Sequence, residues 1–154
     1  MGFRITGLPA SEFADLFFLS DEALRARRAI RKVADASLSY PCRISLTDAE
    51  IGEEVVLVNY EHQRADTPYR ASHAIYVRRG EETFDAVDAV PDQLRRRILS
   101  LRAFDASGMI VDADLVDGRA LEDSIAKLLA DERVAYLHAH FAKFGCYAAR
   151  IERA

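Results

Sequence analysis

The sequence predicts an α+β fold: a single domain with a mainly antiparallel β-sheet and a few packed helices. Short runs of strand-like residues outnumber the runs with helical spacing. Neighbouring strand-like runs are joined by short turns, and strands joined in this way are antiparallel. The chain of 154 residues shows no internal repeat, low-complexity tract or linker, so residues 1–154 are expected to form one domain.

The N-terminal third is expected to hold a first strand, two helical segments and an edge strand. Pro9 suits the first turn of a helix, where its missing N–H is not needed. Ser20 precedes two acidic residues, so its side chain should cap a short helix that reaches about Arg27. The apolar stripe of the first helical segment is Phe13, Leu16 and Phe17, and the strands are 3–6 and 29–33.

The remainder of the chain predicts strands joined by turns, a short helix after Pro91, and one clear amphipathic helix over 119–130. Turns are expected at 51–52 and at 106–108, the second of which closes a compact hairpin. The long helix should pack on one face of the sheet and bury its apolar stripe, which is Leu121, Ile125, Leu128 and Leu129. The expected strands are 43–46, 55–62, 72–78, 98–105, 109–116, 134–140 and 146–152.

Composition and charge narrow the classes of function. A formal net charge of −4 argues against a nucleic-acid partner, which would select a basic face. No run approaches the roughly 20 apolar residues that span a bilayer, and no signal peptide is visible, so we expect no membrane partner and a cytoplasmic location. The two cysteines form no CxxC pair and are expected to be free thiols, not bonded to each other. The oligomeric state stays open.

Strand alternation predicts a polar face at the C-terminal hairpin. His138 and His140 stand two residues apart, so their side chains should point to the same side of a strand. If the hairpin pairs without a slip, Cys146 and Arg150 join them, and Asp112 and Asp114 lie on the polar side of a neighbouring run. The opposite, buried side is then expected to carry Leu137, Ala139, Tyr147 and Ile151.

A metal site is one interpretation of this face. Two imidazoles and a carboxylate, from His138, His140 and Asp112, are adequate ligands for zinc or iron. A His-x-His strand is less specific than a helical HExxH motif, and the plain alternative is a half-exposed polar face. No familiar cofactor-binding motif is present, so the cofactor stays unknown.

Thiol chemistry is a second interpretation. Cys42 precedes Arg43, and a nearby cation favours a thiolate. A histidine could complete a Cys-His pair, which makes Cys42, His73 and His138 the candidate catalytic residues, although the sequence does not say which histidine approaches. A buried cysteine is more commonly a small apolar residue.

The leading hypothesis is a cleft that binds a small anionic molecule. Residues 60–73 place tyrosines, histidines and arginines between two strands, and loops on a sheet are common binding sites. Arginines could supply forked donors to a carboxylate or phosphate, whereas the run 95–97 is expected to be a solvated helix end. The candidate ligand-binding residues are Arg43, Tyr69, Ser72, His73, Arg102, His138, His140 and Arg150.

Several motifs together resemble a bacterial family of small uncharacterised proteins, domain of unknown function 1203. They are Tyr40-Pro41-Cys42-Arg43, Asn59-Tyr60-Glu61-His62, the run 67–78, Leu101-Arg102-Ala103-Phe104-Asp105, Gly108-Met109, Val116-Asp117-Gly118, Tyr136-Leu137-His138-Ala139-His140 and the run 145–150. The resemblance covers nearly the whole chain and implies a bacterial, cytosolic protein. It supplies no activity, cofactor or catalytic residue, so a metal-dependent enzyme and a non-enzymatic interaction protein remain alternatives to the binding hypothesis.

Overall fold

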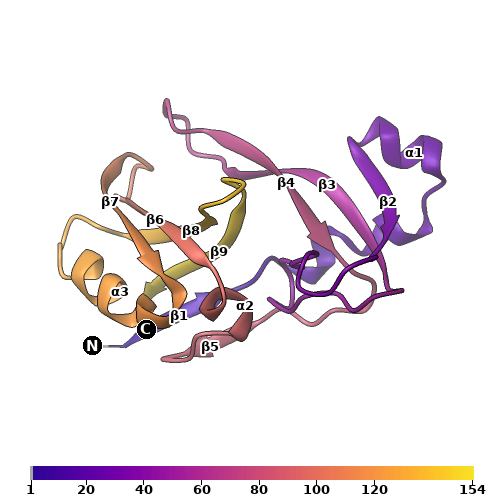
Figure 1. The fold of residues 1–154 in the computed structure, drawn as a ribbon. Helices are drawn as coiled ribbons and strands as arrows, with labels where there is room; N and C mark the ends of the chain where they lie inside the picture. The colour runs from indigo at the N-terminus through magenta and orange to yellow at the C-terminus, as the bar shows by residue number, and fades with distance from the viewer. Residues whose placement is uncertain (1) are drawn as a thin grey trace.

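The structure is a computed structural model that describes residues 2–154, and it contains two antiparallel sheets (Figure 1). This architecture confirms the predicted α+β class and its mainly antiparallel pairing. The larger sheet has the order β5-β1-β9-β8-β6-β7, and the smaller has the order β2-β3-β4. The strands are β1 (Phe3–Thr6), β2 (Ala29–Val33), β3 (Glu54–Gln63), β4 (Ala71–Val77), β5 (Asp85–Val87), β6 (Ile98–Phe104), β7 (Ile110–Asp117), β8 (Tyr136–Phe141) and β9 (Tyr147–Arg153).

The helices follow the sequence signals closely. Ser20 caps α1 by accepting a hydrogen bond from the Ala23 N–H at 3.1 Å, as predicted. The apolar stripe of α3 is fully buried against the larger sheet, which confirms the predicted packing. None of the helices within residues 2–154 is long and apolar enough to cross a membrane. The helices are α1 (Asp21–Ala26), α2 (Asp92–Arg95) and α3 (Leu121–Leu129), with 3₁₀ turns at Ala10–Glu12, Ala14–Phe18 and Gly118–Ala120.

Two large apolar cores and one smaller cluster, which contains Cys42 and Val55, hold the described residues together. One lies between α3 and the larger sheet, where Leu101, Leu137 and Ile151 are fully buried. The second lies on the smaller sheet, beneath the N-terminal 3₁₀ turns. Tyr147 reaches this second core from β9, a strand of the larger sheet. The two sheets therefore share a packed contact at Tyr147, and the site described below is next to it.

The expected strand over 43–46 is not formed. Leu46 has a φ of 54°, which ends any extended run, and the segment folds into turns. A single bridge from Cys42 to Tyr76 joins it to β4, and a bridge between Pro41 and Asp48 closes the loop on itself. The strand β5 was not expected. It has three residues and no alternation long enough to be recognised, and it forms by pairing with β1.

Two β-bulges lie at the cleft between the sheets, and the one in β9 changes which side chain faces it. In β9, Ala149 is paired with Ala139 and Tyr147 with His140, so Ala148 is an extra residue. This slip brings Tyr147 to the same side as His140, whereas the sequence placed Cys146 there. In β3 the register shifts between Glu61 and Gln63, and His62 is the extra residue.

The predicted position of the aspartates is wrong. Asp112 is paired with Ala103, and Asp114 with Leu101, so both lie on the side of the sheet that carries α3. Asp114 accepts a hydrogen bond from Ser124 of α3 at 2.5 Å, which fixes this orientation. Asp112 therefore cannot share a metal with His138 and His140 across this sheet.

Candidate functional site

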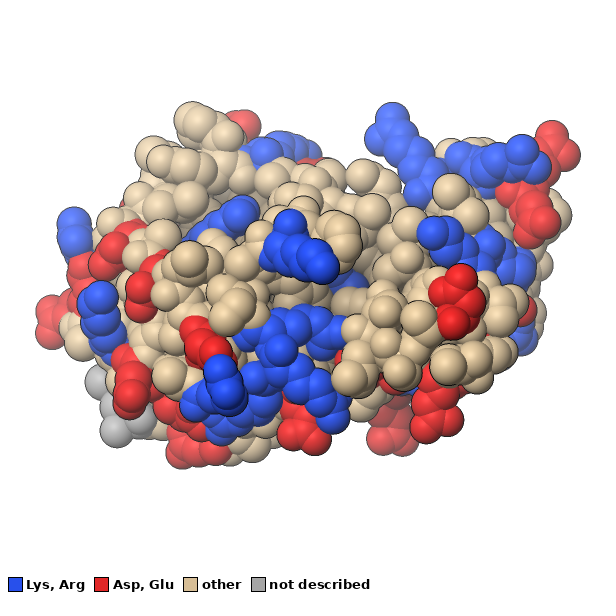
Figure 2. Space-filling view, in the orientation of Figure 1, with Lys and Arg blue, Asp and Glu red and all other residues tan. Residues whose placement is uncertain are grey.

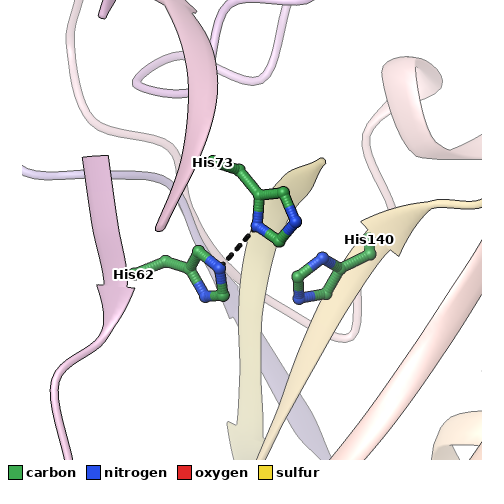
Figure 3. A group of neighbouring side chains, drawn as sticks. All are labelled: His62, His73 and His140. Carbon is green, nitrogen blue, oxygen red and sulfur yellow. Dashed lines mark hydrogen bonds between the residues drawn. The ribbon is translucent and has the colours of Figure 1, made fainter. Parts of the chain in front are cut away.

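The four histidines of the chain converge between the two sheets. His62 comes from β3, His73 from β4, and His138 and His140 come from β8. Figure 3 shows the rings of His62, His73 and His140 turned toward one another from strands of both sheets. The ligand nitrogens of these three residues, hereafter the histidine triad, all lie within 4.8 Å of one another.

Hydrogen bonds define the protonation of the triad. His62 Nε2 and His73 Nδ1 lie 2.7 Å apart, so one ring donates to the other (Figure 3). His140 Nδ1 lies 2.9 Å from the Gly145 carbonyl oxygen, which can only accept, so Nδ1 carries the proton. The lone pair is then on Nε2 of His140, which is buried and has no hydrogen-bond partner within residues 2–154.

Aromatic rings enclose the triad. The His62 ring stacks on Tyr147 with centroids 5.0 Å apart and an angle of 11° between the planes. His138 meets the same tyrosine edge-on at 5.0 Å and lies 6.4 Å from His140, so it borders the triad without belonging to it. Tyr147, displaced onto this side by the bulge, thus supports two imidazoles at once.

The histidines are neutral at physiological pH. Burial lowers the pKa of His62 to about 4, that of His138 to about 3 and that of His140 to about 2. Repulsion from His73 and Arg102 adds to the effect at His62. Burial also lowers the pKa of His73. Unprotonated imidazoles keep one lone pair each, which is the form that binds metal ions and accepts protons.

Arg102 introduces a positive charge beside the histidines. It stands opposite His138 in the pairing of β6 with β8, and it is half-buried. Within residues 2–154 its guanidinium makes no hydrogen bond or ion pair, and burial lowers its pKa. The charge is therefore available to an anion that enters the cleft.

A cavity of ≈ 740 Å³ lies between the sheets next to the triad. His73 belongs to the triad and also lines the cavity. Its charged lining is entirely basic, and Figure 2 shows basic side chains gathered around a hollow between the two halves of the molecule. Among the described residues that line it, none is an aspartate or a glutamate. The lining includes Arg43, Arg96, Arg97 and Lys143 together with the aromatic residues Tyr76, Phe141 and Phe144.

Arg43 holds one wall of this cavity in place. Its side chain is 1% exposed, and its Nε donates to the Tyr147 carbonyl at 2.8 Å. The guanidinium also donates to the Pro41 carbonyl and, at 2.9 Å, to Cys146 Sγ. Burial lowers its pKa, and none of its hydrogen-bond acceptors is a carboxylate. Arg43 thus ties the loop before β3 to the β8–β9 hairpin.

The structure brings half of the predicted ligand-binding residues together. His73, His138, His140 and Arg102 meet in the cleft, and Arg43 lines the adjoining cavity. Of the remaining three, Arg150 stands beside His138 in the pairing of β8 with β9. Ser72 is exposed on the face of β4 opposite His73, Tyr69 contacts Phe104 with centroids 6.5 Å apart, and Arg150 lies 4.1 Å above the Tyr136 ring.

The predicted nucleophile Cys42 is wrong. Its side chain is fully buried, and burial raises the pKa of the thiol to about 12, which outweighs the nearby guanidinium of Arg43. Its sulfur contacts the Tyr40 carbonyl at 3.5 Å and no histidine. Cys42 is a core residue, so the Cys-His pair with His73 or His138 is not formed.

Sequence reasoning missed several residues of the site. His62 was considered only within its loop, because the register that sets it beside His73 depends on a partner strand and cannot be derived from the sequence. Arg96 and Arg97 were expected to be a solvated helix end, but they line the cavity, and Arg97 pairs with Asp48 at 3.2 Å. Nothing in the sequence pointed to Lys143, because it lies in a turn and its neighbours in the cavity come from distant segments of the chain.

Comparison with curated proteins gives no match, and comparison with solved structures also gives none. A family profile matches residues 39–153, which includes all four histidines and the basic lining of the cavity. The matching family is described as Protein of unknown function (DUF1203). The matched segment covers most of the chain and agrees with the resemblance of its motifs. The chain therefore belongs to the DUF1203 family.

Proposed function

We propose that this protein binds a small organic anion in the cavity between its two sheets. The observation that carries the proposal is a cavity whose charged lining is entirely basic, in a chain whose net charge is negative. Its volume of ≈ 740 Å³ falls within the range of about 300–1,000 Å³ that is usual for small-molecule sites.

The charges that line the cavity are unequally neutralised. Asp48 pairs with Arg97 at 3.2 Å, whereas Arg96 makes only looser contacts of 3.8 Å, one with Asp48 and one with the exposed Asp92. Lys143 makes no ion pair within residues 2–154. Arg96 and Lys143 therefore keep positive charge for a ligand, and Arg97 is held by its partner as part of the wall. A carboxylate or phosphate is the chemical group that these donors recognise.

The same lining gives the ligand an apolar part. Phe141 and Tyr76 present ring surface, and Phe144 is 81% exposed at the rim. An aromatic ring in water at the mouth of a cavity gains contact area when an apolar ligand arrives. The proposed ligand class is thus an anion with an apolar body.

Two fluorescent probes test this proposal. 1-Anilinonaphthalene-8-sulfonate carries a sulfonate on an aromatic body, and N-phenyl-1-naphthylamine has nearly the same body without the charge. The variants are Lys143→Gln and Arg96→Gln. Lys32→Gln is the matched control, because Lys32 is exposed on β2 and does not line the cavity.

The sulfonate should bind more tightly than the neutral probe, and each cavity variant should weaken sulfonate binding by roughly 2- to 10-fold, as expected for a partly exposed charge pair. Lys32→Gln should leave both affinities unchanged. Equal affinities for the two probes, or equal effects of Lys143→Gln and Lys32→Gln, would contradict the proposal.

We propose a reducing cytoplasm as the setting of this function. Both cysteines are free thiols, and Cys146 lines the cavity with its sulfur hydrogen-bonded to Arg43. Oxidation of this thiol would remove that contact. Fractionation of cells that produce the tagged protein would test the location, and recovery from an oxidising compartment would contradict it.

A further inference from the structure

We propose that His62, His73 and His140 bind one divalent transition-metal ion of the zinc class. This inference rests on the triad alone and does not depend on the proposed anion-binding function. Three imidazoles from two sheets point to a common centre (Figure 3), and their ligand nitrogens lie within 4.8 Å of one another.

The geometry of the triad needs only small changes to hold the ion. Zinc lies about 2.0–2.1 Å from each imidazole nitrogen, so tetrahedral ligands are about 3.3 Å from one another. His62 Nε2 and His73 Nδ1, now 2.7 Å apart, would separate slightly, and the widest pair would close by about 1.5 Å or less. Rotation of the imidazole rings about their side-chain bonds can supply movements of this size.

The second observation is the orientation of His140. A metal-binding histidine usually donates its other ring N–H to a carbonyl or carboxylate, which fixes the tautomer and aims the lone pair. His140 already has this arrangement, because Nδ1 donates to the Gly145 carbonyl and Nε2 is buried without a partner. A buried nitrogen without a partner destabilises the folded chain, and a metal bond would remove that cost.

His62 and His73 adjust by changing a tautomer. Each neutral ring carries one proton, and one ring now donates its proton to the other. For both facing nitrogens to bind the metal, the donating ring must carry its proton on its other nitrogen. On His62 that nitrogen is Nδ1, which is buried and has no partner among residues 2–154. No net proton release is needed, so the neutral triad can accept a cation directly.

The donor set selects the class of metal. Imidazole nitrogens suit zinc and its first-row neighbours, whereas calcium and magnesium need oxygen ligands that the triad does not offer. Three protein ligands also leave a coordination position free, which is the pattern of catalytic zinc sites. The cavity borders the triad at His73, so an anion bound there would be close to the ion.

Arg102 distinguishes this proposal from its strongest competitor. A nearby guanidinium repels a dication, so Arg102→Gln should tighten metal binding, with a dissociation constant lower by about threefold or more. If the histidines and Arg102 instead form an anion site, Arg102→Gln should abolish binding at this position. The same substitution thus gives opposite results for the two occupants.

The experiment uses the full chain, stripped of metal with a chelator and titrated with Co²⁺ or Zn²⁺ alone. Co²⁺ bound by three imidazoles should give an intense visible spectrum, and Zn²⁺ should displace it at one equivalent. His62→Asn and His140→Asn should lose the spectrum. Asp112→Asn is the matched control, because Asp112 lies on the side of the sheet that carries α3, and it should keep the affinity within about threefold. His138→Asn tests whether the neighbouring histidine binds the ion in place of a triad member.

His62→Asn is the primary variant because His62 is only partly buried, so the fold should tolerate the change. Circular dichroism and the melting temperature establish folding, and Arg102→Gln tests the site without removing a ligand. Absence of stoichiometric binding, or binding lost in His138→Asn and kept in a folded His62→Asn, would overturn the proposal. Anilinonaphthalene sulfonate should still bind His62→Asn, because His62 does not line the cavity, so the two proposals can fail separately.

Discussion

Metal-free protein should lose stability steeply as the pH falls from 7 to 5. Over this range the histidines become protonated in the unfolded chain but stay neutral in the folded chain. His138 and His140 are 3% and 0% exposed, and burial lowers their pKa values to about 3 and about 2. In the unfolded chain each imidazole has a pKa of about 6.5. Because each histidine has a lower pKa in the folded chain than in the unfolded chain, protonation favours the unfolded state once the pH drops below about 6.5. The unfolding free energy then keeps falling until the pH reaches the folded pKa.

The magnitude follows from these values. Between pH 7 and pH 5 an unfolded imidazole becomes almost fully protonated while its buried counterpart stays neutral, which costs about 2 kcal/mol per histidine. The two histidines together should remove about 4 kcal/mol of unfolding free energy, and His62 should add to this loss. A domain is typically stable by about 5–15 kcal/mol, so the effect should be easily measured.

Urea unfolding at pH 7, 6 and 5 in the presence of a chelator measures this dependence. Asp117 does not interfere, because its ordinary pKa of 3.8 and its folded pKa, which its hydrogen bonds with Arg119 lower to about 2, both lie below this window. His138→Gln should show a pH dependence smaller by about 2 kcal/mol, whatever its own stability. Equal stability at pH 7 and pH 5, or an unchanged dependence in His138→Gln, would refute the burial of neutral imidazoles in the cleft.

Further predictions concern the framework of the fold. Gly118→Ala would place a Cβ 1.9 Å from the Leu94 carbonyl oxygen, so it should lower the unfolding free energy by about 1–3 kcal/mol; a wild-type urea midpoint would contradict that contact. Leu128→Ala should cost about 2–5 kcal/mol by leaving a cavity under α3, and a loss below about 1 kcal/mol would show that the helix is not packed there. Denatured, freshly purified protein should titrate two free thiols, and in native protein Cys42 should be protected and Cys146 reactive. Two fast thiols in the native protein would disprove the burial of Cys42.

Local periodicity predicted the framework of the fold well. The stripe of α3 and the cap at Ser20 were recognised because neighbours in sequence decide them. The turn at Leu46 was not predicted, because a leucine rarely has a positive φ and Leu46 is buried among residues distant in sequence. Strand pairing was inferred only in general terms, because register depends on partners far along the chain.

The candidate site was predicted in part for the same reason. His138 and His140 share a side by simple alternation, and this was found. The bulge in β9 defeated alternation, since one extra residue moves the side chains beyond it to the other face. Tyr147 entered the cleft in this way, and Asp112 lies outside it because of the register of β7.

The histidine triad is carried by two separate sheets, and this has a consequence for how the protein folds. His62 and His73 sit on one hairpin and can meet early, whereas His140 arrives on a strand of the other sheet. Contacts between segments distant in sequence form slowly, so the triad should be complete only when the sheets have docked. A ligand that contacts all three rings would then bind the native protein and not the folding intermediates in which the sheets are still apart. Any motion that separates the sheets would separate His140 from His62 and His73 while leaving each hairpin intact. Binding of a ligand by all three histidines would therefore show that the two sheets are docked.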